Sequence, residues 1–324
     1  MRGDVFRSPT RFRIAVAVVL ALGFLFPAAG APVRISFLAE PAALQETVTV
    51  LQSGGCESES LDIFRRAVER YTSSPFDYDL SRFPKPRDGF YSFKSASVLV
   101  AALPQPLCET LHAYEFNCFD TVIALAGDSL RTRIRPDDLA SPFWVPYTRT
   151  NGSFTILPRA TAREAFELAY PEWYRTATSK SLPKSRDELR IALTAALFRC
   201  HLLPQSTTET GLKSAVMAAL HTSWERDKMV FPGRCEMVLC HQVSLPQRWF
   251  VTVHAGLLIS RKDGFTYVEK AGGSGPFVRL DFEERADLLV WLGGMFRGAE
   301  RLGYTHHFAT LNDKKVEVLD VPKR

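Results

Sequence analysis

Three apolar segments near the C-terminal end, separated by short turns, constrain the fold of this chain more than any other feature. Trp249 to Ile259, Phe265 to Lys270 and Phe277 to Phe282 are rich in the β-branched and aromatic residues that favour strands. Lys262-Asp263-Gly264 separates the first two segments, and its glycine is free to adopt the positive φ of a hairpin turn. These segments together predict an antiparallel sheet.

Helical patterns occupy the middle of the chain. Apolar residues recur at helical spacing in Thr161 to Tyr170, Ser185 to Cys200 and Gly211 to Asp227. We expect these segments to form a helical insertion at about residues 160–228 of a single domain that spans residues 31–324. Helices that are separate in sequence from a group of antiparallel strands predict an α+β fold, not a doubly wound parallel sheet.

Other segments carry weaker patterns. Amphipathic helices are expected from Ser60 onward and over Glu283 to Arg301. The stretch Phe308 to Val321 predicts a hairpin around Asn312-Asp313. The short apolar run Ser97 to Leu103 is compatible with a strand or with the start of a buried helix.

The N-terminus has the order of a secretory signal. Four arginines precede the apolar run Ile14 to Phe26, and small residues follow up to Ala31. This run spans only about 20 Å as a helix, whereas a hydrocarbon core is roughly 30 Å thick, so a cleaved signal over residues 1–30 is favoured over a permanent N-terminal membrane anchor. We expect an exported protein, periplasmic or extracellular, with no membrane span after cleavage.

The charge of the chain gives no footprint for nucleic acid. The full chain has 40 basic and 35 acidic residues, and the signal carries four arginines and one aspartate. Removal of the signal leaves 36 basic against 34 acidic residues, which is close to neutral. With 46% hydrophobic residues, the mature chain can fill a core.

Six cysteines in an exported chain permit up to three disulfides, and the sequence alone does not choose their pairing. They stand at positions 56, 108, 118, 200, 235 and 240. The segments Cys200-His201 and Cys235 to His241 offer sulfur and imidazole ligands for Zn²⁺, but the two segments are far apart and the spacing of the second is loose. A disulfide is therefore the favoured role there, and we expect no metal and no other cofactor.

The segment "FNCFDTVIALAGD" places Cys118 at the predicted first turn of a helix. Asn117 is a favoured N-cap residue, and the helix is expected to run to Gly127. The positive end of a helix and a nearby imidazole both lower the pKa of a thiol, and the N–H groups of the first turn can bind an oxyanion. These features predict a nucleophile at Cys118, and a buried or disulfide-bonded structural cysteine is the alternative.

His254, at the start of a predicted strand, is the candidate base, and Glu269 is the candidate third group that orients it. A two-residue turn at Asp263-Gly264 would set Glu269 opposite Leu258, about 13 Å along the strand from His254. A wider loop would set Glu269 opposite Gly256, about 7–8 Å from His254 between Cα atoms. The orienting role needs the second register; otherwise another polar group serves and Glu269 is a solvated edge residue.

Two aromatic residues and one glycine are candidates for substrate contacts. Trp144 and Tyr147 lie in the proline-flanked segment "SPFWVPY", although core packing is the alternative for both. Gly256 shares a strand face with His254 and is expected to leave room there for a substrate or a helix.

These motifs carry a family resemblance. "FNC" before an apolar helix, then H-x-G-x-L-I, "FTYVEK" and Pro276-Phe277, resemble the secreted bacterial proteins grouped as domain of unknown function 4300. More distantly, the pattern is similar to the NlpC-type papain-like cysteine peptidases. The resemblance implies a papain-like core with Cys118 as nucleophile, His254 as base and Glu269 in third position.

The chain departs from the NlpC pattern in two places. Phe119-Asp120 follows the cysteine where that type commonly has Ser-Gly, and a glutamate stands where it has a histidine or an amide. We expect an exported cysteine hydrolase of amidase or peptidase type that acts on peptide amides of the cell wall (peptidoglycan) or, second, on lipid or protein acyl groups. The alternatives are a hydrolytic fold without activity and a non-catalytic exported binding or envelope protein with structural cysteines.

Overall fold

The computed structural model describes residues 32–71, 78–104, 116–133, 135, 138, 143–145, 155–157, 161–169, 187–197, 199–271, 275–297 and 303–321. The expected signal at residues 1–30 and Tyr147 lie outside these ranges. Among the helices in the described ranges, none is long and apolar enough to cross a membrane.

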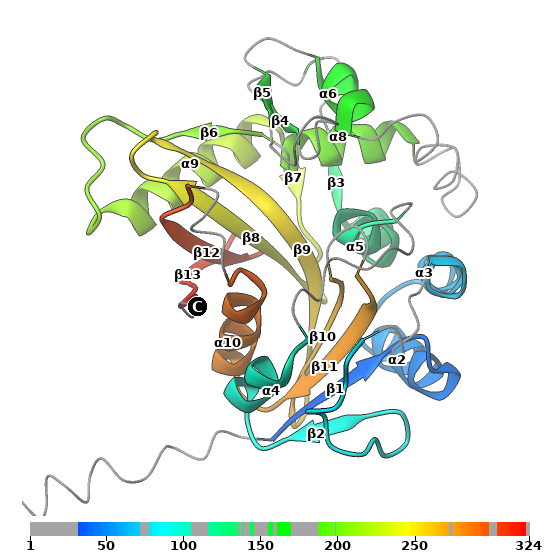
Figure 1. The fold of residues 1–324 in the computed structure, drawn as a ribbon. Helices are drawn as coiled ribbons and strands as arrows, with labels where there is room; N and C mark the ends of the chain where they lie inside the picture. The colour runs from blue at the N-terminus through cyan, green and yellow to red at the C-terminus, as the bar shows by residue number, and fades with distance from the viewer. Residues whose placement is uncertain are drawn as a thin grey trace, which may run out of the picture.

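The fold is α+β, as expected, and is built on one large sheet (Figure 1). Strand order along the sheet is β13-β12-β8-β9-β10-β11-β1-β2, with β6 added beside β9. The strands are β1 (Val33–Phe37), β2 (Tyr91–Phe93), β6 (His201–Leu202), β8 (Glu236–Ser244), β9 (Trp249–Arg261), β10 (Gly264–Lys270), β11 (Phe277–Phe282), β12 (His306–Leu311) and β13 (Lys315–Val318).

The three strands expected from the sequence are β9, β10 and β11, and they form the predicted antiparallel meander. The hairpin of β12 and β13 is also confirmed, and Asn312 in its turn has a φ of 50°. Strand β8 was not predicted, although it pairs with both β9 and β12 in the middle of the sheet. It is buried along both faces, so its sequence lacks the alternation of apolar and polar residues that marks a half-exposed strand.

Helices cover both faces of the sheet. Helices α2 (Pro41–Ser53), α3 (Ser58–Tyr71) and α5 (Cys118–Ala126) bury apolar residues against Leu257 and Ile259. Helices α4 (Ala96–Ala102) and α10 (Arg285–Met295) pack on the other face, against Leu258. Successive residues of β9 point to opposite faces, so one strand serves both layers.

Two ambiguous segments are resolved by these contacts. Ser97 to Leu103 belongs to helix α4, which Ser95 caps by accepting a hydrogen bond from the Val98 N–H. The helix expected over Glu283 to Arg301 is shorter and ends at Met295.

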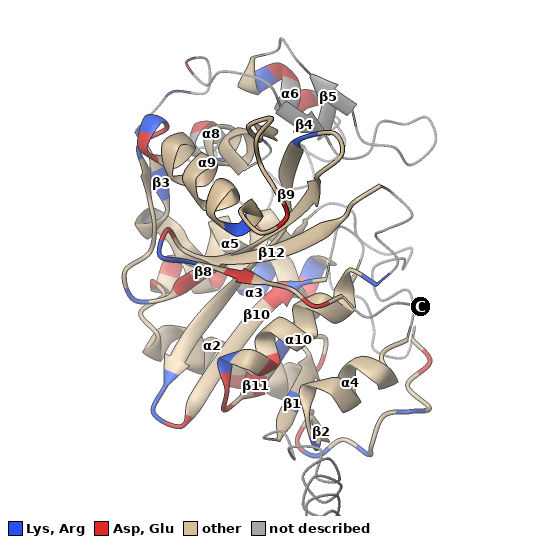
Figure 2. Cartoon of the chain, turned by 90° about the vertical axis from the view of Figure 1, so that its left-hand side faces the viewer, with Lys and Arg blue, Asp and Glu red and all other residues tan. Residues whose placement is uncertain are grey.

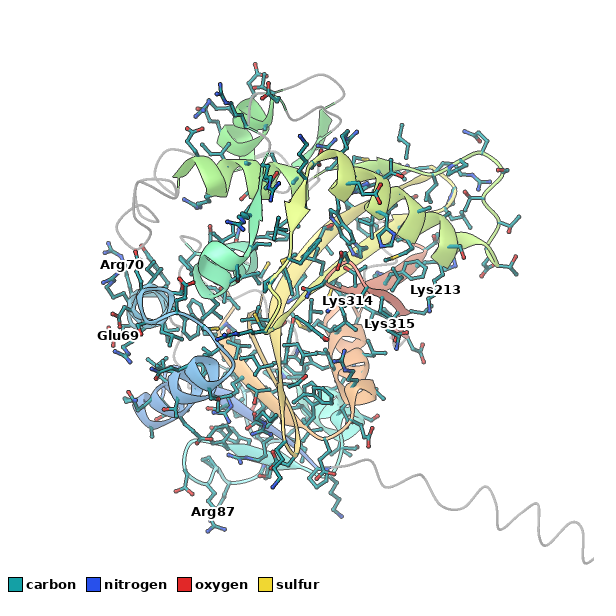
Figure 3. The ribbon with its side chains drawn as sticks, turned by 180° about the vertical axis from the view of Figure 1, so that it is seen from behind. Glu69, Arg70, Arg87, Lys213, Lys314 and Lys315 are labelled. Carbon is teal, nitrogen blue, oxygen red and sulfur yellow. The ribbon has the colours of Figure 1, made fainter. Side chains whose placement is uncertain are left out.

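On α3 the polar side projects outward, and Glu69 and Arg70 on that side point away from the sheet (Figure 3).

The region around residues 160–228 contains the expected helices α6 (Ala162–Ala169), α8 (Asp187–Leu197) and α9 (Leu212–Arg226). Two short strand pairs accompany them, β3 (Arg131–Thr132) with β7 (Met229–Val230) and β4 (Phe143–Val145) with β5 (Thr155–Leu157). Helix α9 contributes to the same core cluster as β8 and β9. That the region is an insertion within one domain stays a prediction.

Acidic and basic residues are interspersed over the face drawn in Figure 2, where red and blue segments share the same elements. Lys213 and Lys315, which are labelled in Figure 3, both lie within ion-pair distance of Glu317. Such mixed charge is the usual composition of a soluble surface.

Candidate active site

Cys118 is the first residue of helix α5, as its sequence predicts. The Asn117 side chain accepts a hydrogen bond from the Asp120 N–H at 3.0 Å, and the Asp120 carboxylate accepts one from the Asn117 N–H at 3.2 Å. This reciprocal capping box fixes the start of the helix. Gly127, with a φ of 53°, follows its last residue.

Asp120 also makes a buried ion pair with a helix from the middle of the chain. Its Oδ1 lies 2.7 Å from Nε of Arg190 on helix α8, and both side chains are almost fully buried. A buried carboxylate of this kind needs a cationic partner. Asp120 therefore ties the helix that carries Cys118 to the middle region of the chain.

Cys118 and His254 meet, and a side-chain hydrogen bond joins them. Helix α5 packs against β9 and β10. Strand β9 continues toward Trp249 beyond the last residue that pairs with β10, which is Gly256. Between Gly256 and Phe250, where β6 pairs, no described strand pairs with this edge of β9, and helix α5 lies beside β9 in Figure 1.

Glu269 holds the far side of the imidazole. Nε2 of His254 donates to Oε2 of Glu269 at 2.5 Å, which leaves Nδ1 for the thiol of Cys118. Glu269 lies opposite Gly256, and this is the register that the orienting role requires. The turn is a two-residue turn at Lys262-Asp263, one position earlier than the turn expected at Asp263-Gly264, so no wider loop is needed.

Two residues that sequence reasoning missed surround the Glu269 carboxylate. Nε1 of Trp291 on helix α10 donates to Oε1 of Glu269 at 2.9 Å. The hydroxyl of Tyr267 adjoins the same carboxylate, and both aromatic residues are fully buried. A buried tryptophan seeks an acceptor for its N–H, but the sequence does not show which one.

Gly256 does not leave open space for a substrate, because the ring of Tyr267 occupies it. A Cβ at position 256 would lie 2.1 Å from the Tyr267 hydroxyl oxygen and 2.3 Å from its Cζ. The expectation of a groove over Gly256 is corrected accordingly. Its role is to admit the tyrosine that borders Glu269.

The electrostatics of the site favour a charged imidazole. Burial lowers the pKa of His254, but the charge of Glu269 and the interaction with Cys118 outweigh burial and raise the pKa to about 10. The ring is therefore an imidazolium at neutral pH.

Cys240 lies directly opposite His254 on strand β8, yet its environment differs from that of Cys118. Burial, with the nearby charge of Glu269, raises the pKa of Cys240 well above its usual range. Cys240 is therefore an unreactive thiol close to the site.

The substrate contacts expected of Trp144 and Tyr147 stay predictions. Trp144 lies in β4, where it pairs with Ile156, and Tyr147 is outside the described residues. Each of the five described cysteines is a free thiol. His241 is held between the hydroxyls of Thr252 and Thr310, and the described ranges contain no cluster of metal-ligating side chains.

No family model, curated protein or solved structure matches this chain. The resemblance to the domain of unknown function 4300 proteins and to NlpC-type peptidases therefore stays an expectation from the motifs.

Proposed function

We propose that this protein is an exported cysteine hydrolase with a papain-like arrangement of its catalytic residues. The observation that carries the proposal is the ordered contact of three side chains. Cys118, at the first turn of a helix, forms a side-chain hydrogen bond with His254, and His254 donates its other ring proton to Glu269. Nucleophile, base and orienting group of this kind define nucleophilic acyl transfer.

In the proposed reaction, the thiolate of Cys118 attacks the carbonyl carbon of an amide or ester. The N–H of Asp120 is used by the cap, and the N–H of Cys118 is the proposed backbone donor to the developing oxyanion. The imidazolium of His254 gives its proton to the leaving amine or alcohol, and a thioester remains. Neutral His254 then takes a proton from water, and the resulting attack releases the acid and regenerates the thiolate.

Peptide amides of the cell wall are the first proposed substrate class, because export and the NlpC resemblance both point to them. Lipid or protein acyl groups are the second. This chemistry needs no metal and no organic cofactor.

The low exposure of the site favours a second candidate, a non-catalytic exported binding or envelope protein. Only 4% of the Cys118 surface and 3% of the His254 surface are exposed. In that role the three side chains would be a buried polar network that stabilises the fold.

Alkylation of the native protein distinguishes the two. We expect iodoacetamide to label Cys118 in the native protein faster than the buried thiol of Cys240. Cys118→Ser should lose this labelling, whereas Cys240→Ser should keep it as the matched control. Labelling that begins only after denaturation would favour the buried network.

Substrate turnover is the second test. The purified protein is incubated with peptidoglycan fragments and, separately, with acyl esters, and the products and any acyl adduct on the protein are followed by mass spectrometry. An adduct on the Cys118 peptide that is absent in Cys118→Ala supports the hydrolase. If Cys118 reacts with iodoacetamide but forms no adduct with either set of substrates, both proposed substrate classes are wrong and another acyl class has to be proposed.

A further inference from the structure

A second pair of side chains, outside the candidate active site, brings two cysteines together from distant parts of the chain. Cys56 lies in the short connection between α2 and α3, and Cys235 immediately precedes β8. Both belong to one buried cluster with Leu257 and Ile259, and a side-chain hydrogen bond joins the two sulfurs.

Glycines allow this close approach. Gly55 has a φ of 92°, and a Cβ there would lie 2.5 Å from Cδ of Arg234. A Cβ on Gly54 would lie 2.7 Å from a side-chain carbon of Ile259. The backbone of the connection between the two helices therefore packs closely against Ile259 of β9 and against Arg234, the residue before Cys235.

Both cysteines are held by their backbones. The Cys56 N–H donates to the Leu51 carbonyl at 3.0 Å, at the end of α2. The Asn312 side chain donates to the Pro232 carbonyl at 3.0 Å and to the Cys235 carbonyl at 3.4 Å. Neither sulfur needs a large backbone movement to stay beside the other.

The hydrogen bond between Cys56 and Cys235 shifts the pKa values of the two thiols in opposite directions. The hydrogen bond to Cys235 and burial raise the pKa of Cys56, whereas the hydrogen bond from Cys56 lowers the pKa of Cys235. The titration of the two thiols is therefore coupled, and the hydrogen bond does not fix which of them attacks an oxidant first.

We propose that Cys56 and Cys235 are a disulfide-forming pair that is oxidised when the protein is exported. The oxidant is a disulfide of a small thiol or of a thiol oxidoreductase, both of which act in exported compartments. The thiolate of one of the two cysteines attacks one sulfur of that disulfide and releases one thiol. The thiolate of the other cysteine then attacks the sulfur of the first and releases the second thiol, so two protons and two electrons leave the protein in total.

This inference does not rest on the hydrolase proposal. The bond joins the α2–α3 connection to the start of β8, a contact between segments that are remote in sequence. It also leaves Cys118 as a free thiol, so oxidation after export and a reactive nucleophile are compatible in one chain.

Peptide mapping of the full-length mature protein tests the pair. Protein exported to a bacterial periplasm, and protein refolded in a mixture of oxidised and reduced glutathione, are alkylated, digested and analysed without reduction. We expect one linked peptide pair that contains Cys56 and Cys235 in both samples. Alkylated, unlinked Cys56 and Cys235 in both samples, or a bond from either residue to another cysteine, would overturn the proposal.

Variants give an independent measurement. Reduction should lower the melting temperature of the wild type and of Cys200→Ala, the control that removes a buried cysteine outside the pair. Cys56→Ala and Cys235→Ala should melt at the same temperature with and without reductant. If these variants still respond to reductant, another disulfide is responsible and the proposal fails; if they do not fold, the peptide map of the wild type decides.

Discussion

Glu269 lies opposite Gly256 on the neighbouring strand, and its carboxylate reaches diagonally to His254 with Oε2 2.5 Å from Nε2. This relationship depends on one turn. A shift of the β9–β10 register by two residues would move the carboxylate to Leu258 and leave the imidazole without its acceptor. The two-residue turn at Lys262-Asp263 is therefore a determinant of the site as well as of the sheet.

Removal of the negative charge of Glu269 should lower the pKa of His254 without changing the fold of the site. In Glu269→Gln we expect the pKa of His254 to fall from about 10 toward its ordinary value, because an amide accepts a hydrogen bond but does not stabilise the imidazolium. NMR titration of the imidazole measures this shift. Glu236→Gln, which breaks a partly exposed pair with Arg285, is the control and should leave that titration unchanged.

Trp291 is a positioning residue, because it acts on His254 only through Glu269. Trp291→Phe keeps most of the packing but removes the N–H donor to Oε1 of Glu269, a bond to a charged group worth about 1.5–3 kcal/mol. We expect an altered pH profile of Cys118 alkylation. Trp249→Phe is the control, because it removes a tryptophan hydrogen bond to Gln247 outside the site, and it should leave the pH profile unchanged. A wild-type profile in Trp291→Phe as well would show that Trp291 contributes only packing.

Gly256 should not tolerate a methyl group. Gly256→Ala forces the buried ring of Tyr267 to move and should destabilise the protein by about 1–3 kcal/mol, the usual cost of overpacking. Urea unfolding measures the loss. Gly233→Ala is the matched control, because a Cβ there has no neighbour within 4 Å, and an equal loss in both variants would contradict the close contact with Tyr267.

The ion pair between Asp120 and Arg190 should be a strong determinant of stability. Asp120→Asn leaves the buried guanidinium without its carboxylate and should cost about 3–5 kcal/mol in urea unfolding. The exposed pair of Asp62 and Arg65 is the comparison, and Asp62→Asn should change stability little. Equal effects would mean that Arg190 finds another acceptor.

Stability should depend on pH through His254. Its pKa is raised on folding from the ordinary value of about 6.5 to about 10, so the stabilisation is fully present below pH 6.5 and is lost as the pH rises toward 10. The slope from one such group is at most about 1.4 kcal/mol per pH unit. We expect the stability difference between wild type and His254→Gln to shrink over this range, and a difference that grows with pH would contradict a charged imidazole.

Local structure around the site was predictable from short stretches of sequence. Asn117 before an apolar run indicated the helix start at Cys118, and Gly264 indicated the turn between β9 and β10. Both signals work at short range, because caps and tight turns depend on the conformations of a few neighbouring residues. The same reasoning found the meander but did not find β8, whose two buried faces carry no alternating pattern.

Partners that come from distant segments were not predictable. Trp291 contacts Glu269 from helix α10, 22 residues further along the chain. Cys56 contacts Cys235 although the two residues are remote in sequence. Tyr267 was on the predicted strand, yet its position over Gly256 depends on the packing of a whole sheet face.

By itself, the amino-acid sequence predicted the α+β class and the helix that begins at Cys118, and it offered His254 and Glu269 as candidate partners of this cysteine. Tertiary structure alone decided the register that brings Glu269 to His254, the filling of the space over Gly256 and the meeting of Cys56 with Cys235. The physical reason is that helix caps and turns are local, whereas register and side-chain contacts are set by burial of surfaces that the chain assembles from remote segments.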